Sequence, residues 1–464
     1  MDAVRWSKEE FGGAQLGDVR RLNRLLAVAA QVAESPAGTV SAVFPNAAQR
    51  QGAYRLLSNE QIDAKVVGDA SHAACVVRCE GEDVVFVPED GSSLNITDTT
   101  HRRGTGPIGA RKMGARGFQV MNAIAVRKDG VPLGIVGQAW WSRAEKADRR
   151  SRKSKPPDER ETKHWGDVMS EVRERFSGTG TVPWFQLDRG GDAWPVFMEA
   201  QQQGQWVTVR SSSDRRIVDH STSKRRYLRE SMAEEAVLGS YELPVTGGHG
   251  RAPRLAHMEI RTRPVVLLMT DDRTSQTHEC LIWCVWTVEV GTVPPGEKAL
   301  DWMLLTTRPV RDLEDAKLTI FGYSLRWRVE EFHKAWKSGA CDVEDLQLHS
   351  ETAIRTWATL LAAAAMRLLR MTYLARHEPT LPATEEFSAD EIHAVHIARN
   401  KEWNGKKMPT IAQITLWIAD LGGYAGKSNG PPGMIVLARG WRRVAPIVPV
   451  VSRLRRLQPS PLTL

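Results

Sequence analysis

The hydrophobic positions at the start of the chain repeat with the period of an amphipathic helix. In residues 16–34 the apolar side chains recur every three or four positions, at Leu22, Leu25, Leu26 and Ala29. Residues 35–38, Ser-Pro-Ala-Gly, break this pattern, and a second helical run follows Pro45. We therefore expect residues 1–70 to form a small helical domain.

After this domain the pattern changes to that of β-strands. Three apolar runs in succession, at residues 84–90, 117–126 and 132–141, predict a meander. A polar helix around residues 161–175 comes next, followed by a strand at 182–188, a helix at 193–202 and a strand at 205–211. This order of elements predicts a mixed α/β sheet with helices.

Residues 212–306 interrupt the α/β pattern with further strands between Pro and Gly turns. Helical periodicity resumes at Leu313 and continues, with breaks, to near Arg376; a further helix is expected at 410–421, before Gly- and Pro-rich loops and a basic end. A chain of 464 residues suits two or three domains. We expect five segments: a helical N-terminal domain (1–70), the first part of an α/β core (71–211), a β-rich insertion (212–306), the second part of the core (307–376) and a mostly helical C-terminal domain (377–464).

Composition indicates a globular protein, with 42% hydrophobic and 25% charged residues. Five cysteines, an odd number, favour a reducing compartment over a disulfide framework. The pairs Cys75/Cys79 and Cys280/Cys284 raise the alternative of zinc, but the second pair lies in an apolar β-like run. No signal-peptide pattern is visible, and the apolar run at 357–366 is too short to span a bilayer, so we expect a cytoplasmic protein without a membrane partner.

The basic balance of the chain favours a polyanionic partner. The net charge is +8, and residues 101–160 contain fifteen Lys and Arg against five Asp and Glu. A solvated basic surface is the alternative. The same two interpretations, DNA contact or a packed helical cap, apply to the arginines of the N-terminal helices, which are Arg20, Arg21, Arg24, Arg50 and Arg55.

Two of the predicted strands end on an aspartate, Asp90 and Asp188. Active sites of open α/β sheets gather at the carboxyl ends of the strands, although a single such Asp is commonly a turn or capping residue. A helix predicted over residues 323–337 adds a third feature. At ~100° per residue a stripe roughly 60° wide carries Tyr323, Arg326, Glu330 and Lys337. Because this stripe is mostly polar, it faces either solvent or a site.

Metal-dependent phosphoryl transfer would explain this combination of side chains. Two Mg²⁺ ions ~4 Å apart need several carboxylate ligands, and both ions act in the in-line displacement of a phosphodiester. The candidate metal ligands are Asp90, Asp188 and Glu330. The candidate phosphate-binding residues are Tyr323, Arg326 and Lys337. Glu331 is the rival ligand, but it lies about 80° from Tyr323 and off the stripe.

The Tyr-x2-Arg-x3-Glu-x6-Lys pattern resembles that of the DDE transposases of the insertion-sequence-four family, and most closely its hairpin-forming, cut-and-paste members. Further similar segments are LGDVRR (16–21), QGAYR (51–55), EDGSSL (89–94), LDRGGD (187–192), QAWW (138–141) and WMLLTTRPV (302–310). The resemblance implies an RNase H-like catalytic core interrupted by a β-rich insertion, an N-terminal domain that binds transposon ends and a C-terminal dimerisation domain.

The resemblance also implies the reaction. Asp90, Asp188 and Glu330 would hold two Mg²⁺ ions, for which Mn²⁺ can substitute. The reaction would proceed by nicking, hairpin formation, hairpin opening and strand transfer. The expected partners are double-stranded DNA, as terminal inverted repeats and as target, and a second copy of the chain in a synaptic homodimer at the bacterial nucleoid.

Two further residues match family positions near a base that flips out of the hairpin. Trp302 would stack on that base, although a tryptophan in an apolar run is also an ordinary core residue, and Arg210 would lie near the hairpin phosphates. The chain departs from the family pattern at Gly91-Ser92 and at Gly190-Gly191. The alternatives are a catalytically silent DNA-binding regulator or domesticated relative, and a stand-alone RNase H-like nuclease.

Overall fold

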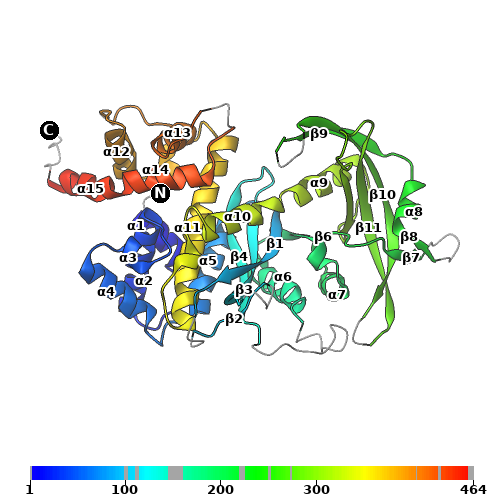
Figure 1. Ribbon diagram of the computed structural model, residues 1–464, viewed down its shortest axis with the longest axis horizontal. Coiled ribbons are helices and arrows are strands. Elements are labelled where there is room, and N and C mark those ends of the chain that lie inside the picture. The colour runs from blue at the N-terminus through cyan, green and yellow to red at the C-terminus, as the bar shows by residue number, and fades with distance from the viewer. Residues whose placement is uncertain are drawn as a thin grey trace. The chain divides into compact units, whose positions relative to one another are not determined.

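The structure is a computed structural model that describes residues 3–98, 103–109, 114–144, 160–218, 225–248, 252–271, 274–403, 405–426 and 430–457. Much of the predicted basic stretch at 101–160 therefore lies outside the described residues. The chain divides into two compact units (Figure 1). Unit 1 consists of Met1–Glu80, Gly91–Lys146 and Arg328–Leu464, and unit 2 consists of Gly81–Asp90 and Ala147–Trp327.

Helices make up most of unit 1. Its elements are α1 (Ala3–Phe11), α2 (Val19–Glu34), α3 (Val40–Val43), α4 (Ala47–Leu57), α5 (Ala64–Arg78), the end of β1 (Val84–Asn95), β2 (Gly106–Pro107), β3 (Arg116–Val126), β4 (Pro132–Trp141), α10 (Trp327–Lys337), η5 (Val343–Asp345), α11 (Glu351–His377), η6 (Ala383–Glu385), α12 (Ala389–Ala398), α13 (Ile411–Leu421), α14 (Met434–Val444), η8 (Ala445–Ile447) and α15 (Val448–Leu457). Strand β3 pairs antiparallel with β2 and β4, and it neighbours β1 in the sheet.

Helix α11 is the central element of unit 1. It packs against α2, α4, α5, β4, α13 and α14, and Figure 1 shows it running alongside both the N-terminal and the C-terminal helices. Its 27 residues are long and apolar enough to cross a membrane by length and composition, but 89% of its most apolar window is buried within the protein. The apolar run at 357–366 is therefore only the middle of a longer helix, and the predicted buried helix is confirmed.

The helices at the two ends of the chain differ from the sequence prediction in extent. Helix α2 begins at Val19 instead of residue 16 because the Asp18 carboxylate accepts a hydrogen bond from the backbone N–H of Arg20 and caps the helix. Leu25 and Ala29 of its predicted apolar face are fully buried. The expected loop and basic end after residue 421 are wrong in part, because α14 and α15 form there and bury Leu437, Trp441 and Val451, among other residues.

Unit 2 is built on a mixed sheet. Its elements are the start of β1, α6 (Lys163–Phe176), β5 (Val182–Leu187), η4 (Arg189–Gly191), α7 (Trp194–Gln202), β6 (Trp206–Arg210), β7 (Arg216–Val218), β8 (Arg225–Tyr227), α8 (Leu228–Ala233), β9 (Gly239–Val245), β10 (Arg254–Thr270), β11 (Thr277–Val290), β12 (Asp301–Thr306) and α9 (Leu313–Ser324). Its strand order is β1-β5-β6-β12-β11-β10-β7-β8, with β9 beside β10. Strands β1, β5 and β6 run parallel, and the other pairs in this unit are antiparallel.

The mixed sheet confirms the predicted α/β class, and its arrangement agrees with an RNase H-like core that carries a β-rich insertion. Helix α9 covers one face of the unit 2 sheet. Its Ile320 and Tyr323 pack with Val285 of β11 and Leu304 of β12 in one buried cluster. Apolar burial of this kind is the main favourable contribution to folding.

Gly322 allows α9 to approach the sheet closely. A Cβ at this position would lie 2.3 Å from the ring of Phe86, which is itself packed against Trp184 and Phe321. The ring is therefore held on several sides and cannot move aside without disturbing the core.

Gly322→Ala should lower the free energy of unfolding by about 1–2 kcal/mol, because the overpacking outweighs the higher helix propensity of alanine. Gly166→Ala in α6, where a Cβ would meet nothing within 4 Å, is the matched control and should raise it by up to ~1 kcal/mol. Urea denaturation followed by circular dichroism measures both. Equal or greater stability of Gly322→Ala would contradict this packing.

Candidate active site

The candidate site in unit 2 begins with the register of three parallel strands. Glu89 of β1 pairs with Leu187 of β5, which pairs with Val209 of β6. The next residues are Asp90, which lies inside β1 and not at its end as predicted, Asp188, which directly follows β5, and Arg210, which ends β6. These three follow at one level on neighbouring strands, which are ~4.8 Å apart. They also share the face that carries Phe86 and Trp184, because side chains two and four positions apart in a strand point the same way.

The two aspartates differ in their local contacts. Asp188 accepts a hydrogen bond of 2.6 Å from the backbone N–H of Gly190 and so caps the short helix η4. Asp90 lies 3.5 Å from a guanidinium nitrogen of Arg326, and its side chain is 21% exposed. The alternative role of Asp188 as a capping residue is therefore real. It uses one carboxylate oxygen and is compatible with a second role.

Tyr323 brings the cationic residues of unit 2 together. Burial raises the pKa of its phenol, while the neighbouring Arg326 and Arg210 act to lower that pKa and Asp188 acts to raise it. The hydroxyl is thus a proton donor at neutral pH, next to two guanidinium groups and a carboxylate. Trp302 lies edge-on to the Tyr323 ring, with centroids 5.7 Å apart. Four of the predicted site residues therefore lie together with Asp188.

Arg210 is held in place by strand β12. It pairs in register with Leu304 of β12, and its guanidinium donates a 3.0 Å hydrogen bond to the carbonyl oxygen of Asp301. Burial, followed by the nearby charge of Arg189, lowers its pKa from the usual value of arginine, although the group stays protonated at neutral pH. A half-buried guanidinium with one anchored nitrogen can still donate to a phosphate.

The single helix predicted over residues 323–337 is wrong. Helix α9 ends at Ser324 and α10 begins at Trp327. At the break the backbone hydrogen bond spans three residues instead of four, because the N–H of Arg326 donates to the carbonyl oxygen of Tyr323. The Ser324 hydroxyl donates a 2.6 Å hydrogen bond to the carbonyl oxygen of Phe321. The helical angles therefore relate Glu330 to Lys337, which both lie in α10, but they do not place Tyr323 and Arg326 on the same stripe.

Glu330 and its rival Glu331 lie on the part of α10 that belongs to unit 1. The Tyr373 hydroxyl donates to both Glu331 oxygens, at 2.9 and 2.8 Å, and Arg328 lies 3.3 Å from the same carboxylate. Glu331 is thus committed to holding α10 against α11. Glu330 is partly exposed. The assignment of Glu330 as a metal ligand stays a prediction.

Lys337 ends α10, seven residues after Glu330, and lies on the same side of the helix. Its ammonium donates a 2.6 Å hydrogen bond to the carbonyl oxygen of Ser93 and lies 3.4 Å from Glu344. Within unit 1 this lysine therefore ties α10 to the end of β1. A phosphate would have to compete with Glu344 for its charge.

A buried histidine that the sequence analysis missed also positions α10. The side chains of Trp140, Gln138, Asn122 and His333 form a chain of hydrogen bonds, in which Asn122 donates to Nε2 of His333 at 3.0 Å. Burial, with a smaller contribution from Lys337, lowers the pKa of His333 to about 3. A single histidine in a helical pattern gave no sequence signal, because its partners come from β3 and β4.

Within the described residues, side chains that could bind a metal ion occur only singly or in pairs. Among them no three His, Cys, Asp or Glu side chains form a group that could hold a metal ion. Asp90 and Asp188 supply hard oxygen donors suited to Mg²⁺ and belong to unit 2, whereas Glu330 belongs to unit 1. The five cysteines are buried free thiols, and burial raises the pKa of Cys280 to about 11.

The predicted N-terminal arginines divide into two groups. Arg21 donates to the carbonyl of Leu16 and to Gln61, and Arg50 donates to the carbonyl of Phe44. These contacts stabilise the helical fold. Exposed side chains on α2 and α4 belong to Arg20, Arg24 and Arg55, of which Arg20 also lies 3.5 Å from Asp18. The exposed group is the better candidate for contact with a polyanion.

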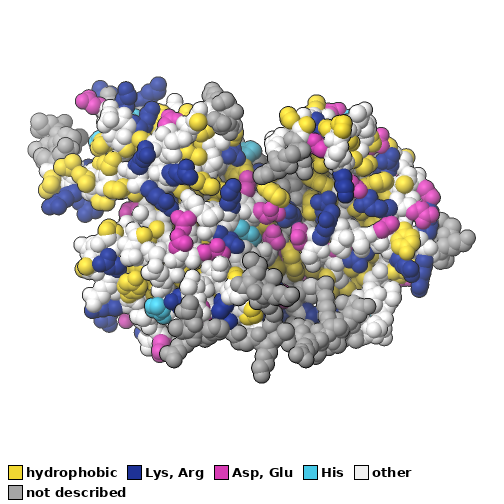
Figure 2. All heavy atoms as spheres, in the orientation of Figure 1, with side chains coloured by type: hydrophobic (Ala, Val, Ile, Leu, Met, Phe, Trp, Pro, Cys, Tyr) yellow, Lys and Arg dark blue, Asp and Glu magenta, His cyan; other side chains and the backbone are white. Residues whose placement is uncertain are grey.

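An apolar stripe lies exposed on the last helix. Leu454 and Leu457 of α15 are 56% and 71% exposed, as is Val450 at 56%, and the spacing puts all three on one side of the helix. Lys and Arg side chains lie next to hydrophobic ones over this helix in Figure 2. Such a stripe is typical of a surface that another chain covers.

The sequences at the two ends of the chain match known families of transposase domains. Residues 3–62 match the family described as Transposase DNA-binding. Residues 363–457 match the Transposase Tn5 dimerisation domain. Together the matches support a DNA-cutting transposase that binds DNA and forms a homodimer.

The buried neutral imidazole of His333 predicts a specific pH dependence of stability. Its folded pKa of about 3 lies below the ordinary value of 6.5. Its contribution is therefore complete above pH 6.5 and is lost as the pH falls toward 3, at up to ~1.4 kcal/mol per pH unit. In His333→Gln, whose amide oxygen can still accept from Asn122, the free energy of unfolding should fall less steeply between pH 6 and 4.

Chemical denaturation at a series of pH values measures this slope. His377→Gln, which removes an exposed histidine at the end of α11, is the control and should keep the wild-type slope. An unchanged slope in His333→Gln would show that the imidazole is protonated in the folded protein.

Proposed function

We propose that the protein is a cut-and-paste DNA transposase of the insertion-sequence-four family, acting on DNA in the bacterial cytoplasm. In this proposal Asp90, Asp188 and Glu330 are the ligands of two Mg²⁺ ions, for which Mn²⁺ can substitute. The observation that carries the proposal is the register that brings Asp90 and Asp188 to one level where the parallel pairing of β1 and β5 ends, on one face. The transposase matches at both ends of the chain support it.

Bound ions would activate a water or a DNA 3′-hydroxyl as the nucleophile and would stabilise the leaving oxygen of the phosphodiester. The protein's own groups would hold the DNA. Arg210 and Arg326 would donate to phosphate oxygens on either side of the scissile bond, and the Tyr323 hydroxyl, kept protonated by burial, would donate to a third. One such site would carry out nicking, hairpin formation, hairpin opening and strand transfer.

Trp302 would offset the unstacking of a base at the hairpin turn. The Trp302 ring packs edge-on against Tyr323. Stacking on a base also requires that one face of the Trp302 ring is not buried in the core. The side chain is only partly buried, next to the cluster beneath α9, which agrees with a role in base stacking.

The two ends of the chain would provide the DNA-end and synapsis functions. The exposed Arg20, Arg24 and Arg55 would contact the terminal inverted repeat, mostly through its phosphates. The apolar stripe on α15 would be covered by a second copy of the chain in the synaptic dimer. Target DNA would bind after the ends are paired.

A catalytically silent regulator is the alternative function. It is favoured by one observation, namely that the matched families describe DNA binding and dimerisation, the two activities that such a regulator would need. It gives no physical reason for Asp90 and Asp188 to lie at one level on adjacent strands with Tyr323 and two arginines around them. The next experiment separates the two functions.

Glu330→Ala should bind a duplex carrying the inverted repeat that borders the gene with wild-type affinity but should neither nick it nor form hairpins with Mg²⁺. Gel-shift and denaturing-gel assays measure the two activities. Glu331→Gln, which keeps a hydrogen-bond acceptor for Tyr373, is the matched control and should cut normally. Cutting by Glu330→Ala would refute its assignment, and a wild-type protein that binds but never cuts would favour the regulator.

Trp302→Ala should slow hairpin formation roughly 10- to 100-fold, because a base–aromatic stack contributes about 1–3 kcal/mol. The first nick, which needs no flipped base, should proceed at close to the wild-type rate. Single-turnover time courses on an end-labelled duplex resolve the two steps. Equal slowing of both would mean that Trp302 has only a packing role.

A further inference from the structure

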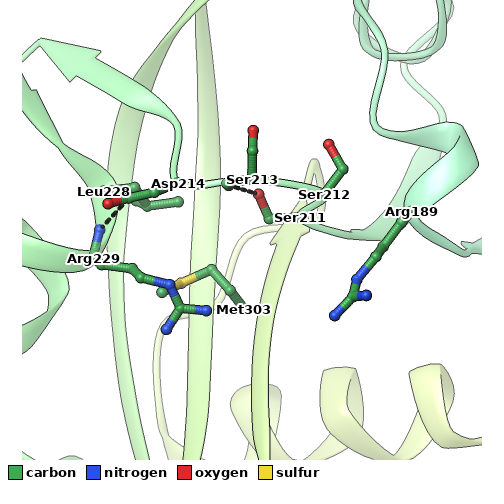
Figure 3. A pocket seen from close by; sticks show the side chains of 8 residues that line it. All are labelled: Arg189, Ser211, Ser212, Ser213, Asp214, Leu228, Arg229 and Met303. Carbon is green, nitrogen blue, oxygen red and sulfur yellow. Dashed lines mark hydrogen bonds between the residues drawn. The ribbon is translucent and has the colours of Figure 1, made fainter.

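A small cavity in unit 2 lies directly beside the row of Asp90, Asp188 and Arg210. Its volume is about 150 Å³ (Figure 3). It is lined by Arg189, Ser211, Ser212, Ser213, Asp214, Leu228, Arg229 and Met303. Two of these residues are sequence neighbours of the row. Arg189 directly follows Asp188, and Ser211 directly follows Arg210.

The loop that forms the cavity is fixed by a buried carboxylate. The Asp192 side chain, with no exposed surface, accepts a 2.6 Å hydrogen bond from the backbone N–H of Ser212 and another of 3.1 Å from Nε of Arg215. The Ser211 hydroxyl donates to the carbonyl oxygen of Ser213 at 2.8 Å. The three serines therefore have a defined position in the absence of any ligand.

The carboxylates around the cavity already have partners. Asp214 accepts a hydrogen bond of 2.9 Å from the backbone N–H of Arg229. Asp301 accepts one of 2.7 Å from the guanidinium of Arg229 and one of 3.0 Å from the indole of Trp286. These acids hold the walls of the cavity in place. They do not provide a cation site there.

The other polar side chains of the cavity are an arginine and serines, which can donate hydrogen bonds. Within the described part of the chain, the Arg189 guanidinium and the hydroxyls of Ser212 and Ser213 make no hydrogen bond. Figure 3 shows Arg189 and Arg229 entering from opposite sides, with the serine loop between them. Two guanidinium groups and adjacent hydroxyls are a combination that matches the oxygens of a phosphate.

We propose that this cavity binds one phosphodiester group of the DNA backbone, and thereby sets the position of the DNA strand relative to Asp90 and Asp188. The inference rests on the proposed function and deepens it. The cavity is smaller than the ~300–1,000 Å³ of small-molecule pockets, so it suits one group of a larger ligand. Its position next to Asp188 and Arg210 would fix the backbone within a nucleotide or two of the reacting bond.

The experiment uses duplexes carrying the bordering inverted repeat in which one phosphate at a time is replaced by an uncharged methylphosphonate. With wild-type protein, replacement at one or two positions near the cut end should weaken binding about tenfold, as expected for the loss of a charge-assisted contact. In Arg189→Gln the same replacement should have no further effect, because the contact is already lost. The salt dependence of binding should also fall by about 0.9 in log–log slope per lost phosphate contact.

Arg189 is the primary variant because it is exposed and makes no contact that folding requires, whereas Arg229 is tied to Asp301. Ser212→Ala is a second variant, which should weaken the effect of the methylphosphonate less than Arg189→Gln does but at the same phosphate position. Arg225→Gln removes an exposed arginine that does not line the cavity and should leave the wild-type pattern unchanged.

The outcomes separate this proposal from the function on which it rests. If the protein cuts the duplex but Arg189→Gln and Ser212→Ala keep the wild-type methylphosphonate pattern, the cavity does not bind a backbone phosphate and the proposal is overturned. If wild-type protein neither binds nor cuts the duplex, the proposed function itself fails. Competition by inorganic phosphate equal to that by DNA would also overturn the proposal, because a free anion would then be the ligand.

Discussion

The parallel register between β1 and β5 is the constraint on which the candidate site depends. Side chains alternate between the faces of a sheet, so a slip of one residue would turn Asp90 to the opposite face, away from Asp188, and would remove Phe86 from its place beside Trp184. The register is fixed by aromatic packing. Phe86 and Trp184 face each other on the two strands, and Gly322 of α9 fits against the same Phe86 ring. The packing that places Tyr323 over the sheet thus also holds the two aspartates at one level.

The strands that carry the aspartates could be predicted from the sequence because apolar runs ending on Asp90 and Asp188 contain local information. The same holds for helices with a capping residue, such as Thr410 before α13. The break after Ser324 could not be predicted, because the sequence around it contains neither a proline nor a glycine after Gly322 and keeps a helical pattern. The contacts of Glu331 could not be predicted either. Glu331 is occupied by Tyr373, a residue 42 positions away.

The remaining features missed by the sequence analysis share one physical origin. His333 is defined by partners on β3 and β4, and the Arg189 cavity is defined by η4, the loop after β6 and α8. Contacts between segments far apart in the chain leave no periodic pattern. Helices α14 and α15 were missed for another reason, since their arginines, Gly440 and prolines hide an apolar side that only packing reveals.

The division of the chain into units has a consequence for how such a protein can change over generations. Each unit is assembled from separate stretches of sequence, and both β1 and α10 contribute residues to two units. Neither unit can therefore be duplicated, exchanged or lost as one continuous piece of gene without cutting through a strand or a helix. The segments at residues 3–62 and 363–457 are each continuous and each match a recognised family, but the second begins inside α11, so only the first can be exchanged without cutting through a helix. Exchange of the first segment can therefore bring new DNA-binding specificity while Asp90 and Asp188 stay unchanged.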